Sequence, residues 1–336
     1  MTTNDSHIQS EPILPRIYPL IDTHTHFDAP VFDNDRDLLT RKAYEQGVRH
    51  LVLVGYLYQH FERMYATEQS IKQTLQSSIT DNDAQDKSAP NVHIALGLHP
   101  FYIERHNEDD LKNVAKKVAE QRPLAIGEIG LDTFTATMKE PDIFAKQERF
   151  FKAQLDIAVA HQLPVMLHIR KAHAEVLAIL KAHEYDAHKL GGIAHSFSGG
   201  VQEAKAFVKL GFKLGVTGQI TNPNAKKLRL AIQGAVEEYG LTCLVIETDC
   251  PDMTPIMCQK RDSTQGNTQD SRSSMHSQST GDEYDDVPIH DRNEPANLPW
   301  VLSTLSELLD VAPAVLAEQL WHNSCTALQT TWTYSK

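Results

Sequence analysis

The sequence predicts a (β/α)8 barrel, because short apolar runs alternate with stretches of helical periodicity along most of the chain. Eight runs rich in β-branched residues are the predicted strands: 18–23, 50–55, 92–98, 124–131, 164–169, 192–195, 212–218 and 244–248. Apolar strands that alternate with helices are typical of a parallel sheet covered by helices, and eight such units match the number in this barrel.

Apolar residues three and four positions apart predict the helices. Their ranges are 36–46, 111–120, 144–161, 174–182, 201–210 and 228–238, followed by 295–309 and 313–329. Asn293, Glu294 and Pro295 put an acid and a proline where a helix start favours them. An open doubly wound sheet is the alternative fold, but no Gly-x-Gly-x-x-Gly sequence follows any predicted strand.

The chain of 336 residues is 41% hydrophobic and 23% charged, as is ordinary for a protein with a large core. We expect an N-terminal extension, 1–17, and a single domain, 18–336. Two polar stretches exceed what a barrel of about 250 residues needs. The first, 76–91, joins the second helix to the third strand. The second, 258–287, is rich in Gln, Ser, Thr, Asp and Gly, which predicts a long flexible loop inserted after the eighth strand.

The charge and the cysteines restrict the function. A net charge of −12 argues against a protein that binds nucleic acid through a broad basic face, although a nuclease with metal ions in its cleft remains compatible with it. No apolar stretch reaches the roughly 18 residues that cross a bilayer, and the first residues are polar. The four cysteines form no Cys-x-x-Cys pair, which predicts reduced thiols. We therefore expect a cytoplasmic protein with no membrane contact.

Two histidines, His24 and His26, follow the first apolar run. In an extended strand, residues two apart point to the same side, so both imidazoles can bind one metal ion. Two surface or half-buried histidines are the alternative interpretation of this pair alone.

Further side chains of the ligand type occur at the ends of other predicted strands. The full set is His24, His26, Glu128, His168, His195 and Asp249. The carboxyl ends of barrel strands face one cavity, where active sites are built, so we expect these side chains to converge. Six ligands are too many for one catalytic ion with an open position. Mixed imidazole and carboxylate ligands suit zinc, magnesium or manganese, and the sequence predicts two divalent ions that activate water for a phosphoryl displacement.

The chain resembles the TatD family of metal-dependent deoxyribonucleases and related hydrolases. Seven segments carry the resemblance, in the family's order: residues 22–28 (DTHTHFD), 97–100 (GLHP), 127–132 (GEIGLD), 168–170 (HIR), 195–199 (HSFSG), 247–251 (ETDCP) and 292–295 (RNEP). The resemblance implies a barrel of the metal-dependent hydrolase type. It also implies that His24, His26 and Asp249 hold one metal, that His168 and His195 hold the second, and that Glu128 bridges them.

We expect a phosphodiesterase that acts on single-stranded DNA or on 3′ ends. The 3′-to-5′ direction is implied by the resemblance alone. Asp249 is the predicted general base, with Glu128 as the second candidate. His99, Arg170 and His173 are candidates for binding the substrate phosphate, and Arg170 is the first of these because its guanidinium offers forked donors.

Two alternatives remain open. The first is an amidohydrolase-type enzyme that cleaves a small cyclic amide or ester. Many such barrels use a carboxylated lysine where this chain has Glu128, which favours the TatD type. The second is a metal-stabilised binding protein with little turnover.

Overall fold

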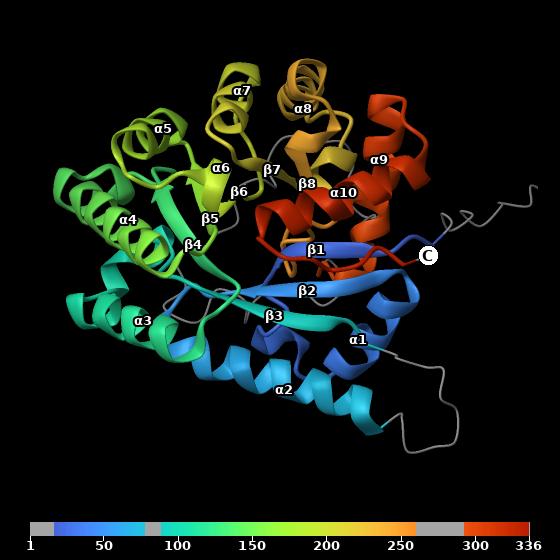
Figure 1. Ribbon diagram of the computed structural model, residues 1–336, viewed down its shortest axis with the longest axis horizontal. Coiled ribbons are helices and arrows are strands. Elements are labelled where there is room, and N and C mark those ends of the chain that lie inside the picture. The colour runs from blue at the N-terminus through green and yellow to red at the C-terminus, as the bar shows by residue number, and fades with distance from the viewer. Residues whose placement is uncertain (1–16, 78–88, 260–291, 336) are drawn as a thin grey trace, which may run out of the picture.

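The computed structural model describes residues 17–77, 89–259 and 292–335. Eight parallel strands form one sheet in the order of the chain, and the helices surround it (Figure 1). The strands are β1 (Leu20–Thr25), β2 (Val48–Val54), β3 (Asn91–Leu96), β4 (Ala125–Asp132), β5 (Val165–Arg170), β6 (Ile193–Ala194), β7 (Lys213–Val216) and β8 (Leu244–Ile246). The predicted (β/α)8 barrel is confirmed, and the open sheet is excluded.

Hydrogen bonds between the first and last strands close the barrel. The amide of Asp249 donates to the carbonyl of His24 at 2.9 Å, and the amide of His26 donates to the carbonyl of Cys250 at the same distance. The Thr23 hydroxyl donates to the carbonyl of Ile246 at 3.1 Å. Closure therefore places Asp249, beyond β8, beside His24 at the end of β1 and His26 just after it.

Each predicted helical range overlaps an α-helix, and several of these helices begin earlier than predicted. The α-helices are α1 (Arg36–Glu45), α2 (Phe61–Ser77), α3 (Glu108–Gln121), α4 (Pro141–His161), α5 (His173–Ala182), α6 (Ala187–Leu190), α7 (Val201–Lys209), α8 (Lys226–Tyr239), α9 (Leu298–Leu309) and α10 (Pro313–Ala327). Two of them, α2 and α6, are not among the predicted ranges. Helix α3 shows the reason for the early starts. Its first turn is polar, and Asn107 caps it by accepting from the amides of Asp109 and Asp110.

Alternate residues of the strands face the interior of the barrel or the helices. In β2, Val52 and Val54 belong to the apolar cluster inside the barrel, together with residues such as Met166 and Val245. Leu51 and Leu53 belong to the larger cluster between the sheet and the helices. Because both faces are buried, the strands read as continuous apolar runs in the sequence.

The amino-terminal ends of the strands are covered by the segment that follows α10. The Trp332 ring stacks on His50 of β2 and His93 of β3, with ring centroids 4.0 and 4.4 Å away. Trp321 of α10 donates from Nε1 to the carbonyl of Trp332 at 2.8 Å. The candidate metal ligands lie toward the opposite, carboxyl-terminal end of the barrel.

Three sequence predictions fall mainly outside the described residues. They are the extension 1–17, the inserted loop 258–287 and much of the polar stretch 76–91. Within the described ranges, no single helix is long and apolar enough to cross a membrane; the segments Pro295–Leu309 and Pro313–Ala327 meet that test only when taken together, across a bend of 113°.

Candidate metal centre

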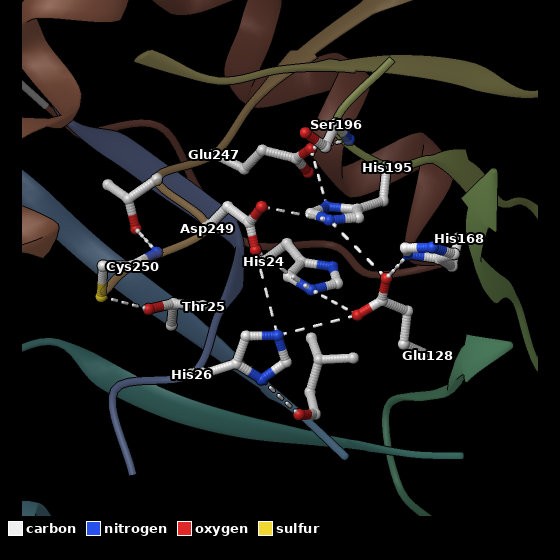
Figure 2. A network of polar contacts seen from close by, with 12 residues as sticks. His24, Thr25, His26, Glu128, His168, His195, Ser196, Glu247, Asp249 and Cys250 are labelled. Atoms are coloured by element: carbon white, nitrogen blue, oxygen red, sulfur yellow. Dashed lines mark hydrogen bonds and ion pairs between the residues drawn. The ribbon is translucent and has the colours of Figure 1, made fainter. Parts of the chain in front are cut away.

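The Glu128 carboxylate stands at the centre of the predicted ligands (Figure 2). Its Oε2 lies 3.2 Å from Nε2 of His24 and 3.7 Å from Nε2 of His26. Its Oε1 lies 2.7 Å from Nδ1 of His168 and 3.8 Å from Nε2 of His195. The two oxygens of one carboxylate thus face two different pairs of imidazoles.

Asp249 faces the β1 side of this cluster. Its Oδ1 lies 3.9 Å from Nε2 of both His24 and His26, and its Oδ2 lies 3.5 Å from Nε2 of His195. Asp249 also has a left-handed backbone conformation, with φ of 55°. Such conformations are uncommon away from glycine and gather at functional sites, where the surrounding structure holds them.

The environment of His24 shows whether the site fits a metal ion. Its side chain is completely buried, and Nδ1 has no hydrogen-bond partner among the described residues, while Nε2 faces Oε2 of Glu128 at 3.2 Å and Oδ1 of Asp249 at 3.9 Å. A buried polar group without a partner is costly, whereas a neutral imidazole nitrogen is a common metal ligand. Three groups of donors whose ligand atoms lie within 4.8 Å of one another occur around it: His24 with His195 and Asp249, His24 with His26 and Glu128, and His99 with Glu128 and His168. The residues present therefore fit a divalent cation.

The electrostatics also favour bound cations. Burial alone would raise the pKa of Glu128, but the neighbouring His99, His195 and His24 hold it well below its ordinary value. Burial alone would lower the pKa of His168, but its hydrogen bonds to Asp132 and Glu128 raise it to about 9. The carboxylates of the cluster thus stabilise positive charge beside them, which is the condition for holding divalent ions.

Three further acceptors orient the candidate ligands. Asp132 Oδ2 lies 2.9 Å from Nε2 of His168, Glu247 Oε1 lies 2.9 Å from Nδ1 of His195, and the Val54 carbonyl lies 3.0 Å from Nδ1 of His26. In each case one ring nitrogen lies close to an acceptor and the other faces Glu128. Acceptors of this kind fix the tautomer and orientation of metal-binding histidines.

The roles of Asp132 and Glu247 were not predicted from the sequence. Both residues lie in the motifs that carry the TatD resemblance, so their positions were visible. What was missing was the long-range pairing of Asp132 with His168 and of Glu247 with His195. The sequence does point to Asp22, which lies close enough to the two histidines to add negative charge or supporting hydrogen bonds, but it does not reveal that Asp22 accepts from the amide and hydroxyl of Thr248.

The three candidates for substrate binding lie at different distances from the cluster. His99 is part of it, because its Nε2 lies 3.2 Å from Oε1 of Glu128. Arg170 follows His168 by two residues on β5, and its guanidinium covers the Phe134 ring. His173 begins α5 and contacts the rings of Phe197 and Phe207. No contact brings His173 to the ligand cluster within the described part of the chain.

The sequence matches the family described as TatD related DNase over residues 21–329. The chain belongs to the TatD family. The predicted resemblance is confirmed, and the chain is a member of a family of metal-dependent hydrolases whose His, Glu and Asp side chains here form groups able to bind metal.

This TatD-family chain is similar in sequence to two named proteins, and for one of them a crystal structure is also similar. It is 34% identical over 236 residues to YjjV, a metal-dependent hydrolase of Escherichia coli K12. The aligned region covers 69% of this chain and 80% of YjjV. The crystal structure of YjjV, described as a TatD homologue, superimposes with a TM-score of 0.69 over 93% of this chain and 98% of that one, at 29% identity. A 3′-5′ ssDNA/RNA exonuclease TatD of Cronobacter turicensis is 27% identical over 86% of this chain and 89% of that protein.

Proposed function

We propose that this TatD-family hydrolase is a two-metal phosphodiesterase that shortens single-stranded DNA from its 3′ end. The observation that carries the proposal is the position of Glu128, whose two carboxylate oxygens face two separate groups of nitrogen donors. A carboxylate so placed could hold two divalent ions at once, as carboxylates do in two-metal phosphoesterase sites.

Six residues would hold the ions. His24, His26 and Asp249 would bind one, His168 and His195 would bind the other, and Glu128 would bind both. Zinc, magnesium and manganese all accept such ligands. When bound, the ions would supply Lewis-acid activation of water and of the phosphate oxygens.

Asp249 would act as the proton acceptor. Its side chain is 12% exposed, whereas that of Glu128 is 2% exposed, so Asp249 is more accessible to a water molecule. The neighbouring His195, His24 and His26 outweigh burial and lower the pKa of Asp249, so its carboxylate is ionised near neutral pH. A carboxylate that is charged and partly exposed can take the proton of the attacking water. Glu128 is the second candidate for this role.

Arg170 would bind a phosphate oxygen of the substrate. It lies two residues beyond His168 on the same strand, so the two side chains leave β5 on the same side. The nucleic acid substrate is supported by the relatives named as 3′-5′ ssDNA/RNA exonucleases, at 26–28% identity. The preference for DNA and the cytoplasmic location stay predictions from the sequence.

The experiment compares substrates under one set of metal conditions. Single-stranded oligodeoxynucleotides labelled at the 5′ end should shorten stepwise in Mg²⁺ or Mn²⁺, and a blocked 3′ end should stop the reaction. A panel of cyclic amides and small esters tests the amidohydrolase alternative. Fast hydrolysis of an amide without cleavage of DNA would favour that alternative. Turnover of neither class by fully metal-loaded protein would favour a binding protein.

A further inference from the structure

Phe134 and Arg170 form a stacked pair at the edge of the metal centre. The guanidinium carbon of Arg170 lies 3.6 Å from the centre of the Phe134 ring. At this distance the ring covers one face of the planar guanidinium, and both side chains remain partly exposed. The remaining N–H groups lie in the plane of the guanidinium, at its edges.

Asp132 joins this pair to the metal centre. Its Oδ1 accepts from the amide of Phe134 at 2.8 Å, while its Oδ2 contacts Nε2 of His168. Asp132 and Arg170 are also direct partners in the register of β4 and β5. The same carboxylate therefore fixes the backbone that carries the Phe134 ring and the imidazole that faces Glu128.

The guanidinium of Arg170 has capacity to bind an anion. Within the described residues it makes no hydrogen bond and no ion pair, although Asp132 and Asp252 lie near enough to feel its charge. Other arginines of this chain do have a carboxylate partner. The Arg36 guanidinium, for example, donates to Asp33 at 2.7 Å. Arg170 thus has donors available to an anion.

We propose that Phe134 is a positioning residue that holds the Arg170 guanidinium in place beside the metal centre to bind a phosphate oxygen of the substrate. This inference rests on one part of the proposed function, namely that the substrate is a phosphate ester. The ring restricts the long arginine side chain before the substrate arrives, which reduces the entropy lost on binding. The two residues then form an anion site at a fixed distance from the metal ligands.

The experiment measures binding of inorganic phosphate to the full chain by titration calorimetry, with four proteins: wild type, Phe134→Leu, Arg170→Met and the double variant. A cation–π contact of about 0.5–2 kcal/mol corresponds to about a 2- to 30-fold effect. We expect Phe134→Leu to weaken phosphate binding about fivefold to tenfold. Because Phe134 acts through Arg170, the double variant should bind no more weakly than Arg170→Met alone.

Two controls separate this role from a general loss of structure. Phe134→Tyr keeps the ring and should retain wild-type binding. Tyr44→Leu removes the ring of a similar pair, with Arg49 at 4.1 Å, at the opposite end of the barrel, and should also leave binding unchanged. If Phe134→Leu fails to fold, Phe134→Met replaces it, since methionine is apolar and of similar size but has no ring, and it should weaken binding to a similar extent.

Two results would overturn the proposal: wild-type affinity in Phe134→Leu, or an additive loss in the double variant. The proposed function fails separately. If the phosphate results are as expected but single-stranded DNA is not cut, the anion site stands and the substrate is another phosphate ester. If DNA is cut but phosphate binding does not depend on Phe134, the inference is wrong and the function stands.

Discussion

Glu247 Oε1 lies 2.9 Å from Nδ1 of His195, and both side chains are buried. The same carboxylate accepts from the amide of Ser196 at 2.6 Å and from the hydroxyl of Thr23 at 3.1 Å. It fits behind His195 because residue 215, on β7, is a glycine: a Cβ there would lie 2.2 Å from Oε1 of Glu247. Glu247 therefore holds His195 with Nε2 toward Glu128 and Asp249.

Glu247→Gln should reduce activity about 10- to 100-fold, the usual cost of losing an acceptor that orients a metal ligand. Gly215→Ala should have a similar effect, because the added methyl group displaces the carboxylate without removing it. Metal retention after dialysis and the rate on single-stranded oligonucleotides measure both variants. The matched control is Glu237→Gln on α8, an exposed glutamate. Wild-type metal retention and rate in Glu247→Gln would show that His195 does not depend on Glu247.

Asp249→Asn should retain at least one metal ion and yet lose about 10² or more in rate. The amide keeps an oxygen that can bind a metal but accepts a proton poorly, and general-base catalysis contributes about 10²- to 10⁴-fold. Single-turnover rates and metal analysis of the same preparation check this. Asp142→Asn, at an exposed position, is the control. Near-normal turnover of Asp249→Asn would assign the proton acceptor to another group, with Glu128 the first to test.

The barrel should lose stability in mild acid because of two histidines beneath Trp332. Burial lowers the pKa of His50 to about 4, and burial, with the charges of His50 and Lys72, lowers that of His93 to about 3. Unfolded histidine titrates near 6.5. Between these pKa values the unfolded chain binds more protons than the folded chain. The contribution of the neutral histidines to the free energy of unfolding is therefore fully present above pH 6.5 and decreases as the pH falls toward 4.

Thermal unfolding at pH 7.5 and pH 4.5 measures this effect. Between these two pH values, the melting temperature should decrease less in His93→Gln than in the wild type. His322→Gln, which changes an exposed histidine, should behave as the wild type. An equal loss in His93→Gln and the wild type would mean that His93 does not limit stability in acid.

The sequence predicted the barrel and the positions of the candidate ligands for a physical reason. A strand buried on both faces is apolar throughout. Polar residues toward its carboxyl end, such as His168, or just beyond it, such as Asp249, are therefore easy to recognise in the sequence. The early start of α3 was not predicted, because its first turn is polar and capped by Asn107 rather than marked by apolar residues.

The supporting contacts could not be predicted from spacing. Glu247 and Thr23 are 224 positions apart, and their contact depends on how β1 meets β8. The contact of Phe134 with Arg170 depends on the register of β4 against β5. The position of His99 beside Glu128 likewise requires the geometry of the closed barrel, since the sequence alone assigned it to substrate binding.

The metal content of the purified chain tests the central claim, a pair of ions bridged by Glu128, most directly. Metal analysis after exhaustive dialysis should find close to two divalent ions per wild-type chain. Glu128→Ala should lose both, because it removes the group that binds each. Glu148→Ala, a partly exposed glutamate on α4, should keep both and serves as the control. A single tightly bound ion in the wild type that survives Glu128→Ala would contradict the two-metal account.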